Sequence, residues 1–190
     1  MSETSALAEI LREQTRIEHE KVDNLVNSLE PFLNKENYGK FLQLQEIFHR
    51  IVDDIYFDPE LNEKIPNLKE LARYKKVQED MQDLGIDKFD IDSLPEPKSV
   101  EAIGWLYCAE GSNLGAAFLL KGAKNIGMSE TYGARHLSPH PEGRGKHWRE
   151  FVRLFNTVTD DNEVYQQVVK GAKNAFEYYA QLAKEVFSKK

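Results

Sequence analysis

The chain of 190 residues has a single cysteine, Cys108. One cysteine excludes an internal disulfide and a thiolate zinc site, and it fits a reducing compartment. The first ten residues lack a basic start followed by an apolar run, so no secretory signal is expected. The formal net charge of −7 disfavours general nucleic-acid binding. We therefore expect a cytoplasmic protein with neither nucleic acid nor membrane as a partner, forming one domain over residues 1–190.

Several common enzyme signatures are also missing. The chain has no Gly-x-Ser-x-Gly elbow for a serine hydrolase, no P-loop, and no Gly-x-Gly-x-x-Gly after a strand. It carries no flavin, nicotinamide or iron–sulfur motif of its own. Alternating runs of Val, Ile and Thr bounded by hairpin turns are absent as well, so no strand is expected. The sequence predicts an all-α protein.

Helical spacing of apolar residues marks the expected elements. Asn34 is a plausible N-cap for the second helix. Asp160, with Glu163 three residues later, is a plausible capping box for the last helix. Pro59 and Pro66 bracket a short linker, a polar loop follows at residues 85–97, and residues 128–145 form a long irregular segment. The expected helices cover residues 4–28, 34–57, 67–83, 98–127, 146–158 and 161–188.

Two glycines lie inside the longest apolar helix. Gly111 and Gly115 are four residues apart and so share one face of the helix. Each costs about 1 kcal/mol relative to alanine in a helix interior. A chain that accepts this twice on one face needs bare backbone there, for a closely packed helix or for a flat ligand. Glu110 and Asn113 nearby argue against a membrane span.

The irregular segment is basic in an otherwise acidic chain. Residues 133–149 hold four basic residues, three histidines and one acid. Connections of this length in a compact domain are usually functional or disordered. A solvated surface loop explains the composition equally well.

Two histidines are candidate metal ligands. His19 has Asp23 one helical turn later, where a carboxylate can accept a hydrogen bond and strengthen a ligating imidazole. A lone helical histidine is nevertheless more often a surface or core residue. Glu46 and His49 form a Glu-x-x-His, which di-iron bundles use, but those sites need a second copy that is absent here. Cys108 is a possible thiolate ligand, although a small apolar filler is the simpler reading.

Three stretches together resemble heme oxygenase, most closely the short bacterial, biliverdin-forming type. They are Leu11-Arg-Glu-Gln-Thr-Arg-Ile-Glu-His19, Glu110-Gly-Ser-Asn-Leu-Gly-Ala-Ala117, and the segment from Gly133-Ala-Arg-His-Leu137 to Gly145-Lys-His-Trp148. The resemblance extends over nearly the whole chain. It implies a single-domain helical bundle with heme between the first (proximal) helix and a glycine-kinked distal helix.

The resemblance also assigns roles to individual residues. His19 matches the axial ligand of the heme iron, and Asp23 matches an acid that supports it. Gly111 and Gly115 match glycines over the opposite, distal face of the heme, where Ser112 completes the expected catalytic group. Ser112 stands where mammalian relatives carry an aspartate that holds distal water. That departure follows the bacterial pattern and leaves more of the task to backbone and ordered water.

Further heme contacts are expected around these residues. Arg12 lies two helical turns before His19, and Tyr107 one turn before Gly111. Both are candidate partners of the heme propionates, and in bacterial relatives such a pair accompanies cleavage at the α-meso carbon. Additional candidates for binding heme or an electron donor are Lys146 and Arg149. Phe176 and Tyr179 are candidate walls of the pocket, although plain core packing explains them almost as well.

The implied reaction uses heme as both substrate and cofactor. Dioxygen and electrons convert it to biliverdin, carbon monoxide and ferrous iron. Because the chain has no redox cofactor motif, a separate reductase or ferredoxin must deliver the electrons, with the basic segment as a candidate dock. Iron acquisition from heme is the expected purpose. Two alternatives stay open: a heme carrier or sensor without turnover, and a thiaminase-like enzyme that uses a cysteine and carboxylates on the same fold.

Overall fold

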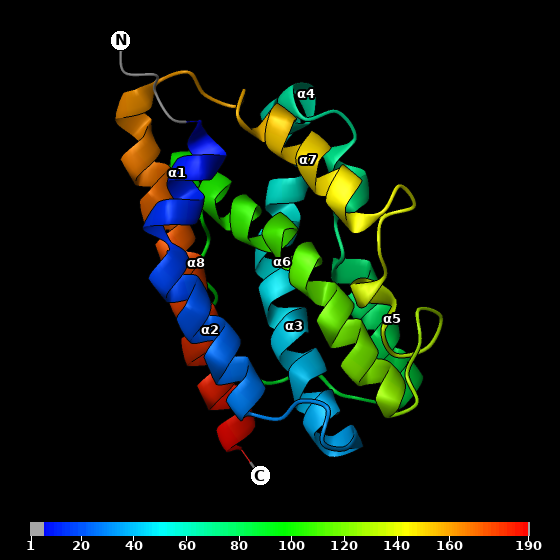
Figure 1. The fold of residues 1–190 in the computed structure, drawn as a ribbon. Helices are drawn as coiled ribbons and strands as arrows, with labels where there is room; N and C mark the ends of the chain where they lie inside the picture. The colour runs from blue at the N-terminus through cyan, green and yellow to red at the C-terminus, as the bar shows by residue number, and fades with distance from the viewer. Residues whose placement is uncertain (1–5, 190) are drawn as a thin grey trace.

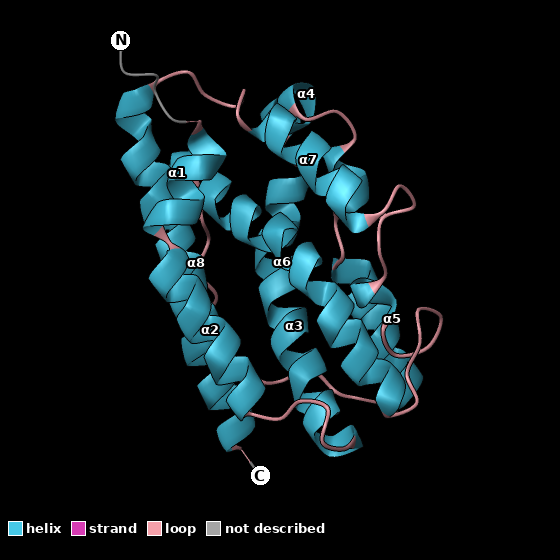
Figure 2. Cartoon of the chain, in the orientation of Figure 1, coloured by secondary structure: helices cyan, strands magenta, loops and turns pink. Residues whose placement is uncertain are grey.

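The computed structural model describes residues 6–189, and within this range the chain forms helices and loops without a strand (Figure 2). The all-α prediction is confirmed. Short 3₁₀ turns cover Leu68–Leu71, Arg135–Leu137 and Asn162–Val164. The α-helices are α1 (Leu7–Gln14), α2 (Arg16–Ser28), α3 (Lys35–Tyr56), α4 (Pro59–Lys64), α5 (Tyr74–Leu84), α6 (Ser99–Asn125), α7 (Arg144–Phe155) and α8 (Tyr165–Ser188).

Helix α6 runs through the middle of the fold, and α8 packs against it (Figure 1). The two helices meet at Gly104 and Gly171. A Cβ atom at Gly104 would lie 2.2 Å from the carbonyl oxygen of Val168, and one at Gly171 would lie 2.1 Å from that of Glu101. Glycine is therefore required on both sides of this crossing.

The glycines that sequence analysis emphasised have other surroundings. A Cβ at Gly115 would meet nothing within 4 Å, and one at Gly111 would lie 3.5 Å from the ring of Trp148. Close helix packing is thus the role of Gly104 and Gly171, and Gly115 presents its backbone to open space. Helix α6 is continuous past these glycines, and Figure 1 shows it changing direction about midway along its length.

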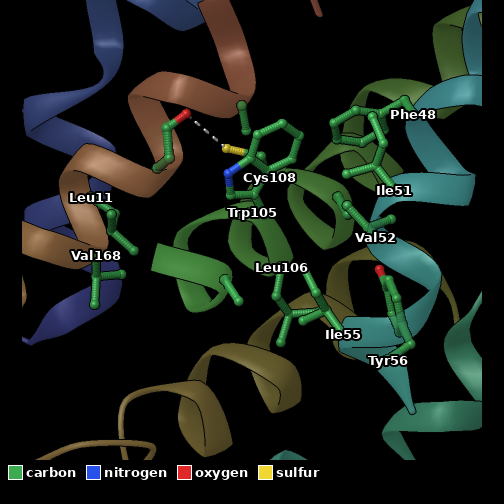
Figure 3. Close-up of a cluster of buried hydrophobic side chains, with 14 of the residues drawn as sticks. Leu11, Phe48, Ile51, Val52, Ile55, Tyr56, Trp105, Leu106, Cys108 and Val168 are labelled. Atoms are coloured by element: carbon green, nitrogen blue, oxygen red, sulfur yellow. Dashed lines mark hydrogen bonds between the residues drawn. The ribbon is translucent and has the colours of Figure 1, made fainter. Parts of the chain in front are cut away.

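A core of buried apolar side chains holds α3, α6 and α8 together. Phe48 and Val52 of α3 face Trp105 and Leu106 of α6 in Figure 3. Phe48 stacks on Trp105 with 6.1 Å between ring centroids. A second buried cluster joins the other end of α6 to α3 and α5. The site described below is therefore built on rigid, well-packed helices.

Two expected helices are interrupted. The helix expected over residues 4–28 begins at Leu7, with residues 4 and 5 outside the described range, and breaks at Thr15. The Thr15 hydroxyl donates to the carbonyl of Leu11 at 2.6 Å. A side-chain hydrogen bond of this kind competes with the bonds of the helix backbone and favours a break or bend. The helix expected over 67–83 is a 3₁₀ turn followed by α5, which starts only at Tyr74.

The other boundaries differ by a few residues. The expected linker between Pro59 and Pro66 contains α4, because the Asp58 carboxylate accepts from the Leu61 N–H at 2.9 Å and Pro59 suits the first helical turn. Asn34 caps α3 as expected. The capping box at Asp160 is wrong: Asp161 accepts from the Glu163 N–H and caps a 3₁₀ turn, and α8 starts after it.

None of the helices within residues 6–189 is both long and apolar enough to cross a membrane.

Candidate functional site

Residues of α2 and α6 line a cavity of about 1600 Å³. In Figure 1 helix α2 lies to the left of α6. Side chains of α3 and α8 also contribute to the walls of the cavity. Most of the residues singled out from the sequence converge on it, although they come from distant parts of the chain. Those that line the cavity are Arg12, His19, Asp23, Tyr107, Gly111, Ser112, Gly115, Phe176 and Tyr179.

His19 stands on α2, a helix with no fully buried residue. Its side chain is 59% exposed, and its ring stacks on Phe176 of α8 with centroids 5.2 Å apart and planes 20° from parallel. The Nε2 atom lies 3.4 Å from a carboxylate oxygen of Asp23. The imidazole is thus supported on one side by the Phe176 ring and is open on the cavity side. The Asp23 carboxylate lies close to its Nε2 atom.

The opposite wall is the bare stretch of α6. Gly115 has open space where a side chain would be, and the Trp148 ring covers Gly111. The Ser112 hydroxyl donates to the carbonyl of Ala109 on its own helix at 2.6 Å. The proton of that hydroxyl is therefore engaged within α6.

Two tyrosines are among the residues that line the cavity. Tyr107 packs between Trp148 and Phe155, and burial raises the pKa of its phenol to about 12, so it stays protonated. Tyr179 donates to the side-chain oxygen of Gln45 at 2.6 Å. Burial raises the pKa of Tyr179 as well. Both phenols are therefore hydrogen-bond donors at neutral pH.

Two predicted contacts lie elsewhere. Lys146 and Arg149 are exposed on α7 and are not part of the cavity lining. The ammonium of Lys146 lies 3.7 Å from a carboxylate oxygen of Glu142. A contact between either residue and heme propionates remains a prediction.

The cavity is also lined by a buried pair of histidines that no sequence motif indicates. His136 shares a hydrogen bond of 2.8 Å between its Nδ1 and Asp80, and its ring centroid lies 6.2 Å from that of His49. Burial lowers the pKa of both histidines, so both are neutral. Neither His49 Nδ1 nor His136 Nε2 has a partner among the described residues. His49 was considered only as a metal ligand, and nothing in sequence spacing pairs it with His136.

The alternatives based on other metal or thiol chemistry find little support. Glu46 is fully buried and bound by Arg50 and Tyr74, each at 3.2 Å. Within residues 6–189 no three His, Cys, Asp or Glu side chains cluster as a metal site, which argues against a di-iron centre. Burial raises the pKa of the Cys108 thiol, so it is a poor nucleophile for thiaminase-like chemistry.

The residues present fit a flat apolar ligand with an axial metal. Leu114 and Phe118 of α6 line the cavity yet are 43% and 67% exposed, so an apolar ligand would cover them. His19 can supply a nitrogen ligand, and Arg12 lies among the lining residues where it can pair with acidic groups. A helical fold with an imidazole facing bare backbone across such a space defines a heme-binding protein.

Comparison with known proteins identifies the family within this class. The sequence model of heme oxygenase matches residues 5–185. The heme oxygenase PigA of Pseudomonas aeruginosa is 33% identical over 173 residues, which are 90% of this chain and 87% of that protein. The chain belongs to the heme oxygenase family and is a heme-degrading oxidoreductase.

Solved structures agree with this assignment. The NO- and CO-bound heme oxygenase of Neisseria meningitidis superposes with a TM-score of 0.94 at 49% identity, covering 97% of this chain and 94% of the other. The heme oxygenase of Leptospira interrogans gives a TM-score of 0.73 at 19% identity, covering 95% and 100%, a likeness of fold. The resemblance and fold class inferred from the sequence are confirmed.

Proposed function

We propose that this heme oxygenase binds heme with its iron on His19 and converts it to biliverdin IXα, carbon monoxide and ferrous iron. The observation that carries the proposal is the placement of His19 on α2 opposite Gly115 on α6, across a cavity that Phe176 and Phe118 also line. Bound heme supplies the iron that activates dioxygen and the porphyrin edge that is oxidised.

The protein side chains bind and orient the substrate. A neutral imidazole is a modest axial donor, unlike a cysteine thiolate, which promotes cleavage of the O–O bond. The Asp23 carboxylate, 3.4 Å from His19, can hold the ring in place and increase its basicity. Gly115 has no side chain, so its backbone would leave room for a ligand to lie close against α6. Together these features favour chemistry at the porphyrin edge.

Orientation of the heme decides which meso carbon is attacked. Arg12 and the protonated phenol of Tyr107 both line the cavity and can hold propionates. Their presence supports the α-meso product.

The electrons would come from a separate reductase or ferredoxin. The exposed cations Lys146 and Arg149 support docking of an acidic donor on α7. We further propose that the enzyme acts in the cytoplasm and that the iron it releases is its main product for the cell.

Heme titration of the purified protein tests the axial ligand. His19→Ala should lose the Soret spectrum of the histidine-ligated complex, whereas Asn24→Ala, on the exposed part of α2 outside the cavity lining, should bind like the unaltered protein. An unchanged spectrum in His19→Ala would refute the proposed ligand.

Turnover with ascorbate or a reductase tests the product. The Soret band should decay into a verdin band, and chromatography should show the α isomer. Stable heme without decay would mean a carrier or sensor, and mainly β or δ biliverdin would refute the proposed orientation.

A further inference from the structure

A buried carboxylate lies directly behind the bare wall of the cavity. Glu110 of α6 is fully buried and accepts three hydrogen bonds: from the Tyr56 hydroxyl at 2.5 Å, from His147 Nε2 at 3.1 Å, and from Asn113 Nδ2 at 3.2 Å. These donors come from α3, from α7 and from α6 itself. Glu110 is not part of the cavity lining, whereas Asn113 is.

The oxygens of a carboxylate accept hydrogen bonds, so each of the three neighbours turns a donor toward Glu110. Tyr56 satisfies this condition because burial, together with the charge of Glu110, raises the pKa of its phenol and keeps its proton in place. Asn113 carries a donor at one end of its amide and an acceptor at the other. With Nδ2 committed to Glu110, the oxygen Oδ1 is the end left for a molecule in the cavity.

The backbone of Asn113 is anchored independently. Its carbonyl accepts from the Arg144 guanidinium at 2.9 Å, and the same guanidinium donates to the carbonyl of Leu137 at 2.6 Å. Helix α6 is therefore fixed at this point to α7 and to the segment beside His136. Rotation of the amide is the remaining freedom of Asn113, and Glu110 removes it.

We propose that Glu110 is a positioning residue that makes the side-chain oxygen of Asn113, and not its NH₂ group, face the ligand bound between His19 and Gly115. Glu110 does not touch that ligand and acts only through Asn113. The inference rests on the proposed function, because it requires a ligand on the His19 side of the cavity.

The ferrous heme–CO complex is the probe. Glu110→Leu removes the oxygen that accepts from Asn113 Nδ2, which frees the NH₂ group to turn toward the cavity. A donor near bound CO lowers its stretching frequency, so Glu110→Leu should shift the band to lower frequency while heme still binds. In an Asn113→Ala background the same substitution should cause no further shift.

A matched control separates positioning from general destabilisation. Val52→Ala removes buried methyl groups from α3 without touching this network, and should lower the melting temperature while leaving the CO band in place. An unshifted band in Glu110→Leu would overturn the proposal. An equal shift with and without Asn113 would overturn it too, because Glu110 would then act through its charge alone.

A second variant tests the contact without heme. Asn113→Asp places two carboxylates side by side, with Tyr56 and His147 still facing the pair. One carboxyl must keep a proton, so the ligand-free variant should lose stability relative to the unaltered protein as pH rises from 5 to 8. Parallel pH profiles would refute the contact. The proposed function is tested separately, by loss of heme binding in His19→Ala. Failure of the proposed function and failure of the Glu110 proposal are therefore distinguishable.

Discussion

One substitution, glycine to alanine, should have opposite effects at two places on α6. At Gly104 the new Cβ would lie 2.2 Å from the Val168 oxygen and 2.4 Å from the Ala172 nitrogen. An ordinary C···O contact is about 3.3 Å, so α6 and α8 must separate by roughly 1 Å. Both contacts are to backbone, which cannot move aside as a side chain would.

The expected magnitudes follow from these contacts. Overpacking of this kind costs up to about 3 kcal/mol. The better helix propensity of alanine offsets about 1 kcal/mol, which leaves a net loss of about 2 kcal/mol and a melting temperature about 4–8 °C lower. At Gly115 nothing lies within 4 Å, so only the propensity gain of about 1 kcal/mol remains. That variant should melt about 2–4 °C higher.

Thermal unfolding of the ligand-free protein, followed by circular dichroism, measures both effects. Gly171→Ala is a second test of the same crossing, because its Cβ would lie 2.1 Å from the Glu101 oxygen. A Gly104→Ala protein that melts at or above the unaltered protein would refute the close approach. A Gly115→Ala protein that melts lower would show that the backbone there is already covered.

Two further predictions concern the cavity. His49 and His136 are neutral when folded because burial lowers their pKa values, so the unfolded chain binds protons below about pH 6.5 that the folded chain does not. Stability of the ligand-free protein should therefore fall between pH 7 and 5, by up to about 1.4 kcal/mol per pH unit for each histidine. Urea unfolding of His49→Gln should show a shallower fall, and an equal slope would contradict this. Phe118→Ser should weaken heme binding by about tenfold or more, as expected from losing burial of an aromatic ring, with free-protein stability within about 0.5 kcal/mol. Phe57→Ser, at a position that is also largely exposed but lies outside the lining of this cavity, should bind heme normally, and equal losses in the two variants would refute the assignment.

Local signals in the sequence account for much of the fold. Apolar spacing located the long helices, and Asn34 was recognised as the cap of α3 because its side chain bonds the third residue along. The signal for α4 is present as Asp58 followed by Pro59, although a linker was expected between Pro59 and Pro66. The break at Thr15 could not be predicted from spacing, since the hydroxyl competes for a carbonyl that apolar periodicity does not register.

The candidate site was predictable where a motif is local. His19 with Asp23, and Gly111 with Gly115, are each one helical turn apart, so the helix itself fixes their geometry. Glu110 is different, because its partners Tyr56 and His147 lie 54 and 37 residues away and meet it only when α3 and α7 pack on α6.

By itself the sequence determined the all-α class, the family and the candidate residues on α2 and α6, because helical periodicity and short motifs act over a few residues. Tertiary structure alone decided which glycines bring helices together. Gly104, Gly111, Gly115 and Gly171 look alike in the chain, and only packing against α8 and Trp148 separates a glycine that admits a helix from one that faces open space. That distinction depends on distances between segments, which no local pattern contains.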